Sequence, residues 1–360
     1  MTNSKWLSAL LAGTALTVAS TAAFADTSML TMTRNAAGEG VTFSISPTAD
    51  MPAASTEVTI SGELRALLRS TKEDGSDRET DLNTRARVVV KGKTDTSVGL
   101  VGAYVRFNQS NFSDDNNHVD TDKAYGYWEF SPGVTLNVGR NDSIASVVQG
   151  ADWNGTQLFS GDGAGLTNAS ANQANVSFTS GPVAMTVGIE HSAVGSDLGV
   201  AANTVFSAGD FSAQLAGKSA KTDDTDIAAG DTAYAIGGGI GFSSGGFGLS
   251  VGAATGTGLA AEYVTVNTGD TTDDKFTAMS VLGTFNMTET TSLEAWYGTG
   301  TIEEIAATTA DRKVSGYGAG VFWNPVSQLR LGAGAGTHTI DAAGVETDST
   351  QIGVGAWFKF

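Results

Sequence analysis

Apolar and polar residues alternate with a period of two along most of this chain. The carboxyl-terminal segment shows the pattern in full, because Ile352, Val354, Ala356, Phe358 and Phe360 share one parity. Glutamine, glycine and lysine stand among the intervening positions. Alternation of this kind indicates a β-strand with one apolar face.

The segment from 232 to 261 carries no charged residue and is long enough for a membrane-spanning helix. It is rich in glycine, however, and its apolar residues alternate in twos. The parity reverses across residues 243–246, which are two serines followed by two glycines. A reversal at a Gly-rich step predicts a β-hairpin and argues against a helix.

The same unit recurs along the chain, with short turns and longer polar segments in alternation. Short turns are predicted at 94–96, 131–133, 180–182, 208–210, 243–246, 287–290 and 324–327, and long polar segments near 71–80, 109–120, 142–171, 193–200, 221–230, 255–274, 301–312 and 340–348. Seven short and eight long connections predict sixteen strands, or fourteen or eighteen if one hairpin is miscounted. The expected fold is all-β, a transmembrane antiparallel β-barrel with short turns on one side.

The amino-terminal region divides into two parts before the barrel. Residues 1–25 have a positive Lys5, a short apolar core and an Ala23-Phe24-Ala25 cleavage pattern, which predicts a secretory signal peptide. Residues 26–55 fit no strand pattern, and their structure stays open. We therefore assign 56–360 to the barrel domain.

Composition narrows the classes of function. The 360 residues include 20 Lys and Arg against 38 Asp and Glu, so the formal net charge of −18 excludes a nucleic-acid binder. The 46 glycines are roughly twice the usual share. With no cysteine and three dispersed histidines, we expect no metal site and no cofactor. No triad of nucleophile, base and orienting group is evident, so we expect no enzyme.

The two rims of the predicted barrel differ in chemistry. Carboxylates concentrate in the long segments, where an ordered calcium motif is not evident. Aromatic residues concentrate near the short turns, as a membrane-interface girdle requires; they are Trp128, Phe130, Phe178, Phe206, Phe211, Phe242, Phe247, Phe285 and Trp323.

Parity places a basic patch on the lumenal side of the first three barrel strands. A charge facing the lipid midplane costs about 2–4 kcal/mol, so charged residues in these strands should face the lumen. The predicted basic lining consists of Arg65, Arg69, Arg85, Arg87 and Arg106. These arginines could instead pair with carboxylates only as a solvated structural network.

The longest connection, the third long segment, runs from Asn141 to Ala171 and contains no Lys or Arg. Segments of this length are usually functional or disordered. If it folds into the barrel, Asp152 and Asp162 would lie opposite the arginines and narrow a lumen that is otherwise wide enough for water. Arg140 stands at the entry of this loop.

Together, the signal sequence, hairpin pattern, acidic third loop, basic patch and terminal Phe360 resemble the general diffusion porins of Gram-negative bacteria, with the alphaproteobacterial branch closest. Gly139-Arg140-Asn141 resembles the step into the family's constriction loop, and Phe159-Ser160-Gly161-Asp162 resembles the end of that loop. The family's glutamate before this Phe is Leu158 here.

The resemblance implies an outer-membrane homotrimer that contacts lipid and lipopolysaccharide, and a Phe360 read by the outer-membrane assembly machinery. It implies passive diffusion of ions and small hydrophilic solutes. Two alternatives remain at this point: a closed-lumen surface-structural or adhesion barrel, and a substrate-selective channel. The usual device of a selective channel, a lumenal ladder of stacked aromatics, is not evident in the sequence.

Overall fold

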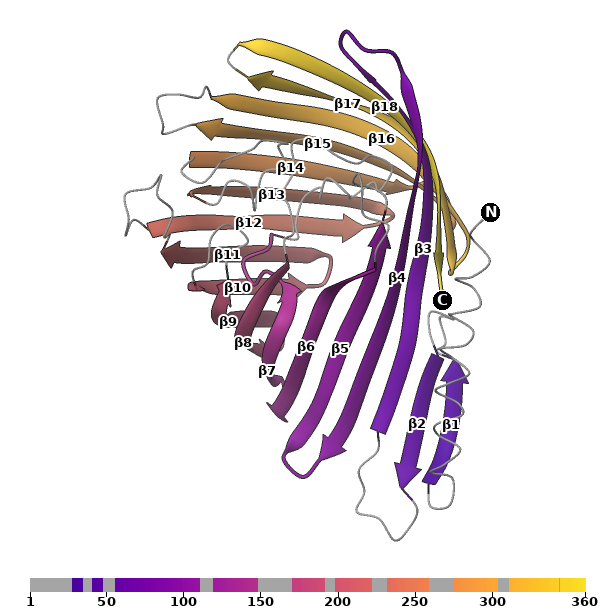
Figure 1. Ribbon diagram of the computed structural model, residues 1–360, viewed down its shortest axis with the longest axis vertical. Coiled ribbons are helices and arrows are strands. Elements are labelled where there is room, and N and C mark those ends of the chain that lie inside the picture. The colour runs from indigo at the N-terminus through magenta and orange to yellow at the C-terminus, as the bar shows by residue number, and fades with distance from the viewer. Residues whose placement is uncertain are drawn as a thin grey trace.

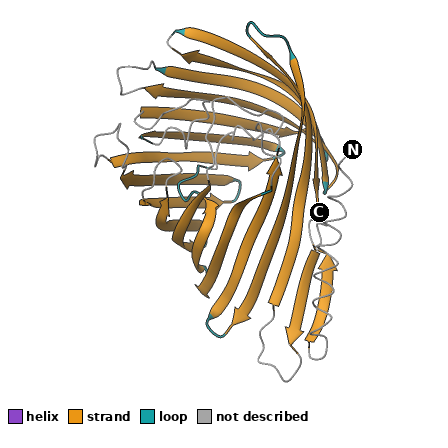
Figure 2. Cartoon of the chain, viewed as in Figure 1, coloured by secondary structure: helices purple, strands orange, loops and turns teal. Residues whose placement is uncertain are grey.

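The computed structural model describes residues 28–34, 41–47, 56–110, 119–147, 170–191, 198–221, 232–258, 275–303, 311–342 and 344–360. Strands wrap around a central lumen, with β10–β15 on one side of the view and β3–β5 on the other (Figure 1). Throughout these ranges the strands are joined by short turns, and no helix that could span a membrane is found among them (Figure 2).

Sixteen strands, β3 to β18, pair in chain order, each antiparallel to the next. They are β3 (Thr56–Glu73), β4 (Glu79–Thr96), β5 (Gly99–Ser110), β6 (Asp120–Ser131), β7 (Val134–Asp142), β8 (Ser170–Ser180), β9 (Val183–His191), β10 (Leu198–Ala208), β11 (Phe211–Lys221), β12 (Thr232–Ser244), β13 (Phe247–Thr257), β14 (Lys275–Asn286), β15 (Thr291–Glu303), β16 (Arg312–Val326), β17 (Leu329–Ala342) and β18 (Val345–Lys359).

The sheet closes because β18 returns to pair with β3, from Ser349 opposite Glu73 to Lys359 opposite Glu63. Phe360 extends this seam by exchanging two backbone hydrogen bonds with Gly62, each 3.0 Å long. The prediction of a closed sixteen-stranded antiparallel barrel is confirmed. Closure removes the free sheet edges that an open membrane sheet would expose to lipid.

Residues that the sequence left open form a further hairpin, β1 (Ser28–Arg34) with β2 (Val41–Pro47). β2 pairs with the first part of β3, where Val41 lies opposite Ile60. Since β18 pairs with β3 only from Glu63 onward, β2 and β18 lie end to end along the same edge of β3. The hairpin therefore prolongs the barrel wall beyond the carboxyl terminus (Figure 1).

Turn chemistry explains the predicted hairpin at 243–246. β12 ends at Ser244 and β13 begins at Phe247, so Gly245 and Gly246 form the loop, with φ of 60° and 84°. Positive φ at both central residues of a two-residue loop is the type I′ geometry, which suits the twist of paired strands.

Three connections differ from prediction. β4 extends to Thr96 and β16 to Val326, so these turns lie at 97–98 and 327–328 rather than at 94–96 and 324–327. The eighth long segment, expected near 340–348, is only a short connection, because β17 extends to Ala342 and β18 begins at Val345. The polar residues predict loops because they contact water. Strand pairing nevertheless continues through polar residues beyond the apolar band, so these strands are longer than predicted.

The outward face is apolar, as a lipid-facing surface requires. On β3, Leu64 and Leu68 are 52% and 48% exposed, while Leu67 between them is 1% exposed. All nine aromatic residues predicted near the short turns are exposed on the outward face. The alternation that predicted the strands therefore also separates the lipid-facing side from the lumenal side.

Candidate functional site: the lumenal lining

Four arginines on three neighbouring strands form what we call the basic wall: Arg65 on β3, Arg85 and Arg87 on β4, and Arg106 on β5. Arg65 lies directly opposite Arg85 in the strand register. Their parity is opposite to that of the exposed Leu64 and Leu68, which places the guanidinium groups on the lumenal side. The structure thus brings these four predicted residues together.

A single carboxylate, Glu63, lies at the centre of this wall. Its Oε2 accepts a hydrogen bond from Arg65 Nη2 at 3.0 Å, and its Oε1 accepts one from Arg85 Nη2 at 3.1 Å. Arg87 Nη1 donates to the same Oε1 at 3.4 Å. Charge-assisted hydrogen bonds of this kind hold the three guanidinium groups in fixed positions.

The remaining arginine has its own acidic partner. Arg106 Nε donates to Asp122 Oδ1 at 2.8 Å, and its Nη2 lies 2.7 Å from Oδ2. Arg87 also donates to Asn108 Oδ1 at 3.0 Å. The basic wall therefore sets four guanidinium groups against two carboxylates, and its local charge is positive.

Other predicted site residues are placed differently. Arg69 shares the lumenal parity of Arg65 but lies further along β3, opposite Asp81. Arg140 is the last residue of β7 that pairs with β6. It has the same parity as the exposed Val138, so it lies on the outward side of the barrel and apart from the basic wall. Asp152 and Asp162 lie outside the described residues, and their predicted position opposite the arginines stays a prediction.

The beginning of the third loop folds inward, as expected for this barrel. After β7, residues 143–147 are buried, and Ser143 and Ile144 both bind Glu190 on β9. Ser143 Oγ donates to Glu190 Oε1 at 2.6 Å, and the Ile144 backbone N–H donates to Oε2 at 2.7 Å. Glu190 itself is fully buried, so one wall carboxylate anchors the loop's first turn.

A buried cation completes this anchor. Lys218 Nζ on β11 lies 3.2 Å from Glu190 Oε1, and the two side chains are 1% and 0% exposed. Two amide side chains hold the next residues: Asn203 donates to the Ile144 carbonyl at 3.0 Å, and Gln214 donates to the Ser146 carbonyl at 2.7 Å. The four hydrogen bonds made by Ser143, Ile144 and Ser146 attach residues 143–147 to β9, β10 and β11.

Sequence reasoning missed the Glu190–Lys218 pair. A usable signal was present, since Glu190 is the only Asp, Glu, Lys or Arg of β9 and Lys218 is the only one within β11 before its last residue, Lys221. A charge at such a position is rarely buried without a partner. The contact between Glu190 on β9 and Lys218 on β11 could not be predicted from the sequence, however, because it depends on the register of both strands with β10.

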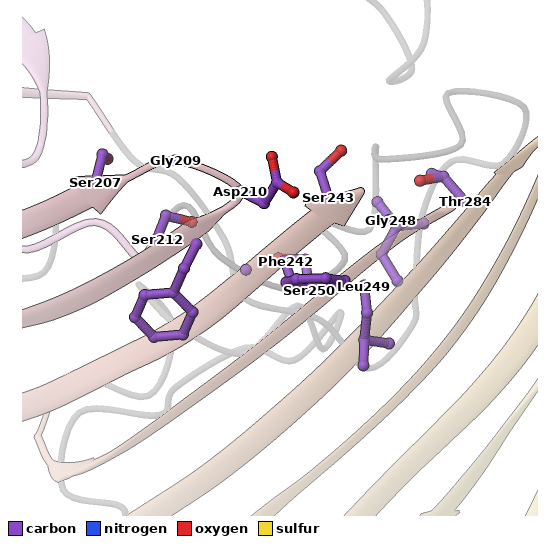
Figure 3. A pocket seen from close by; sticks show the side chains of 13 residues that line it. Ser207, Gly209, Asp210, Ser212, Phe242, Ser243, Gly248, Leu249, Ser250 and Thr284 are labelled. Carbon is purple, nitrogen blue, oxygen red and sulfur yellow. The ribbon is translucent and has the colours of Figure 1, made fainter. Parts of the chain in front are cut away.

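The wall facing the arginines has little exposed charge among the described residues, because β12 and β13 carry no charged side chain and Lys218 of β11 is buried in its ion pair with Glu190. β12 is eight strands from β4 in a ring of sixteen, so β11–β13 lie across the lumen from the basic wall. Near the short turns these strands form a hollow of about 520 Å³. Hydroxyl groups of Ser212, Ser250 and Thr284 line it, with Asp210 at its edge (Figure 3). Such a surface offers weak hydrogen bonds to hydrated solutes.

Two pairs of aromatic residues flank the basic wall, one on each side. Tyr104 and Tyr125 stack with ring centroids 5.1 Å apart and an interplanar angle of 17°. On the other side, Phe322 and Trp357 pack at 6.1 Å. Parity alone places Tyr104 on the lumenal side, but its pairing with Tyr125 depends on the register of β5 and β6.

No family model and no curated protein matches this sequence. Solved structures do match it in fold. An OmpF of Salmonella typhi in complex with daunomycin has a TM-score of 0.65 at 12% identity, covering 85% of this chain and 98% of its own. An anion-selective porin from Comamonas acidovorans has a TM-score of 0.62 at 14% identity, covering 85% and all of its chain.

A third similar structure is an in-vitro folded OmpT of Vibrio cholerae in a trimer form. It has a TM-score of 0.59 at 16% identity and covers 85% of this chain and 99% of its own. All three are outer-membrane proteins or porins by description, and each is matched over almost its full length. The chain therefore has the fold of a porin-type β-barrel.

Proposed function

We propose that this protein is a passive channel for ions and small hydrophilic solutes in the outer membrane of a Gram-negative bacterium. The observation that carries the proposal is the basic wall, which places four guanidinium groups on the lumenal side of a closed barrel. A cluster with net positive charge is stable inside a barrel only where water reaches it. A sixteen-stranded barrel is wide enough for an aqueous channel.

The lining supports a pore with charge on one side. Arginines on β3–β5 face a hydroxyl-bearing wall on β11–β13, in which β12 and β13 carry no charged residue. Charged and polar groups on opposing walls orient water and polar solutes as they pass. Diffusion of this kind requires no enzyme chemistry, no metal and no cofactor.

The partners follow from the same proposal. The apolar outward face would contact lipid and, at the outer rim, lipopolysaccharide. We further propose a homotrimer, which the trimer form of the similar Vibrio cholerae OmpT supports. Phe360 would be read by the outer-membrane assembly machinery. From the overall resemblance of the sequence, we also propose that the protein is of the alphaproteobacterial type of general diffusion porin.

Reconstitution of the purified protein in a planar bilayer tests the function directly. We expect discrete current steps and a modest reversal potential under a salt gradient, with triplet steps if the protein is a trimer. Silence from correctly folded, heat-modifiable protein would instead favour the closed-lumen surface barrel.

Neutralising two arginines should change ion selectivity. Arg85→Gln together with Arg87→Gln removes two positive charges from the basic wall, so we expect the cation-to-anion permeability ratio to rise roughly fourfold, about twofold for each charge. The reversal potential in a potassium chloride gradient measures this ratio. An unchanged reversal potential in an open channel would contradict a lumenal role for these side chains.

A further inference from the structure

A fifth arginine stands in the same transverse row as the basic wall, on the other side of the barrel seam. Arg330 on β17 lies directly opposite Trp357 on β18. Trp357 lies opposite Arg65 on β3, and Arg65 lies opposite Arg85 on β4. Directly opposed residues of neighbouring strands share one face of a sheet, so Arg330 is lumenal like Arg65 and Arg85.

An aromatic surface supports the Arg330 guanidinium. Its central carbon lies 3.9 Å from the ring centroid of Phe322 and 6.0 Å from that of Trp357. Both rings are buried against Gly332, where an added Cβ would lie 2.7 Å from Phe322 and 3.1 Å from Trp357. Stacking on a ring orients a guanidinium without removing its charge.

One carboxylate balances this cation. Arg330 Nη2 lies 2.6 Å from Glu294 Oε1 on β15. The Arg330 side chain is 30% exposed, whereas the side chains of the basic wall are 13% to 23% exposed. Arg330 is therefore more open to the lumen than any of those four arginines, while Glu294, at 12% exposed, is more enclosed.

We propose that Arg330 extends the basic wall across the seam and is a specificity-determining residue for solutes that carry a carboxylate or phosphate group. The planar guanidinium matches the geometry of such oxyanions. Phe322 and Trp357 hold Arg330 in position, and Glu294 tunes the net charge of the site. This inference rests on the proposed channel function.

Variants of the two charged partners should shift selectivity in opposite directions. Arg330→Gln leaves Glu294 unpaired and should raise the cation-to-anion permeability ratio roughly twofold, the effect of one unit charge about 10 Å away in water. Glu294→Gln frees Arg330 and should lower the ratio by a similar factor. The double variant should return close to the wild-type ratio, and Lys275→Gln serves as a control that removes a positive charge from an exposed strand end.

A second measurement uses succinate as the oxyanion probe. We expect the permeability of succinate relative to chloride to fall in Arg330→Gln, and to recover only in part in Arg330→Lys, which keeps the charge but loses the planar fork. A role limited to stabilising the barrel would change heat stability without these opposite shifts.

The outcomes separate the inference from the function on which it rests. A conducting wild-type channel whose reversal potential is the same in both single variants and the Lys275→Gln control would overturn the role of Arg330 and leave the channel function intact. A wild-type protein that folds but does not conduct would overturn both. If Arg330→Gln does not fold, Glu294→Gln decides the inference by its shift toward anions or the lack of one.

Discussion

Replacing Glu190 by glutamine should destabilise the barrel more than any other single change considered for this protein. The substitution leaves the buried Lys218 ammonium without its carboxylate, and removing one partner of a buried ion pair costs about 3–5 kcal/mol. It also weakens the hydrogen bonds from Ser143 and Ile144. We expect a lower temperature for the conversion of folded to unfolded barrel on an unheated-versus-heated gel series.

A matched double variant separates charge from packing. Glu190→Leu combined with Lys218→Met removes both charges and keeps apolar volume, so it should be more stable than either single variant. Ser143→Ala removes one donor only and should cost about 1 kcal/mol. Single variants as stable as the wild type would show that this pair does not hold the loop. We also expect noisier open-channel currents in Glu190→Gln, because residues 143–147 lose their anchor in the lumen.

Most of the architecture could be predicted from the sequence. Lipid on one side and water on the other impose a period of two, so Leu64, Leu68 and the aromatics near the short turns revealed both the strands and their outward face. An even number of strands then follows from alternating short and long connections. The β1–β2 hairpin was missed although Val41, Phe43 and Ile45 of β2 alternate with polar residues. This strand is short and pairs with only the first part of β3.

The site was predictable only in part. Parity placed Arg65, Arg85, Arg87 and Arg106 in the lumen, because charge on the lipid side is costly. Parity does not predict which strands are neighbours across the seam, however. Arg330 and Trp357 are separated from Arg65 by most of the chain, and they meet it only because β18 returns to β3. The contact between Glu190 and Lys218 is hidden for another reason, since it spans β10 and depends on the register of β9, β10 and β11.

Glu63 offers the sharpest test of what the basic wall does. In Glu63→Gln, the guanidinium groups of Arg65, Arg85 and Arg87 lose a shared carboxylate that lies within 3.4 Å of all three. We expect the anion-to-cation permeability ratio to rise roughly twofold, the effect of one unit charge about 10 Å from the ion path in water. The reversal potential under a potassium chloride gradient measures the change.

Two explanations of the arginines give different results in this variant. If they serve only as a structural network, Glu63→Gln should lower the heat stability of the barrel, by about 1–3 kcal/mol, and leave the reversal potential unchanged. If they line the ion path, the reversal potential moves toward anions whether or not stability falls. Glu63→Asp keeps the carboxylate charge and should hold selectivity near the wild-type value. The shift in reversal potential expected for Glu63→Gln is opposite in direction to that expected for Arg85→Gln with Arg87→Gln. If the arginines line the ion path, the two experiments must therefore move the reversal potential in opposite directions.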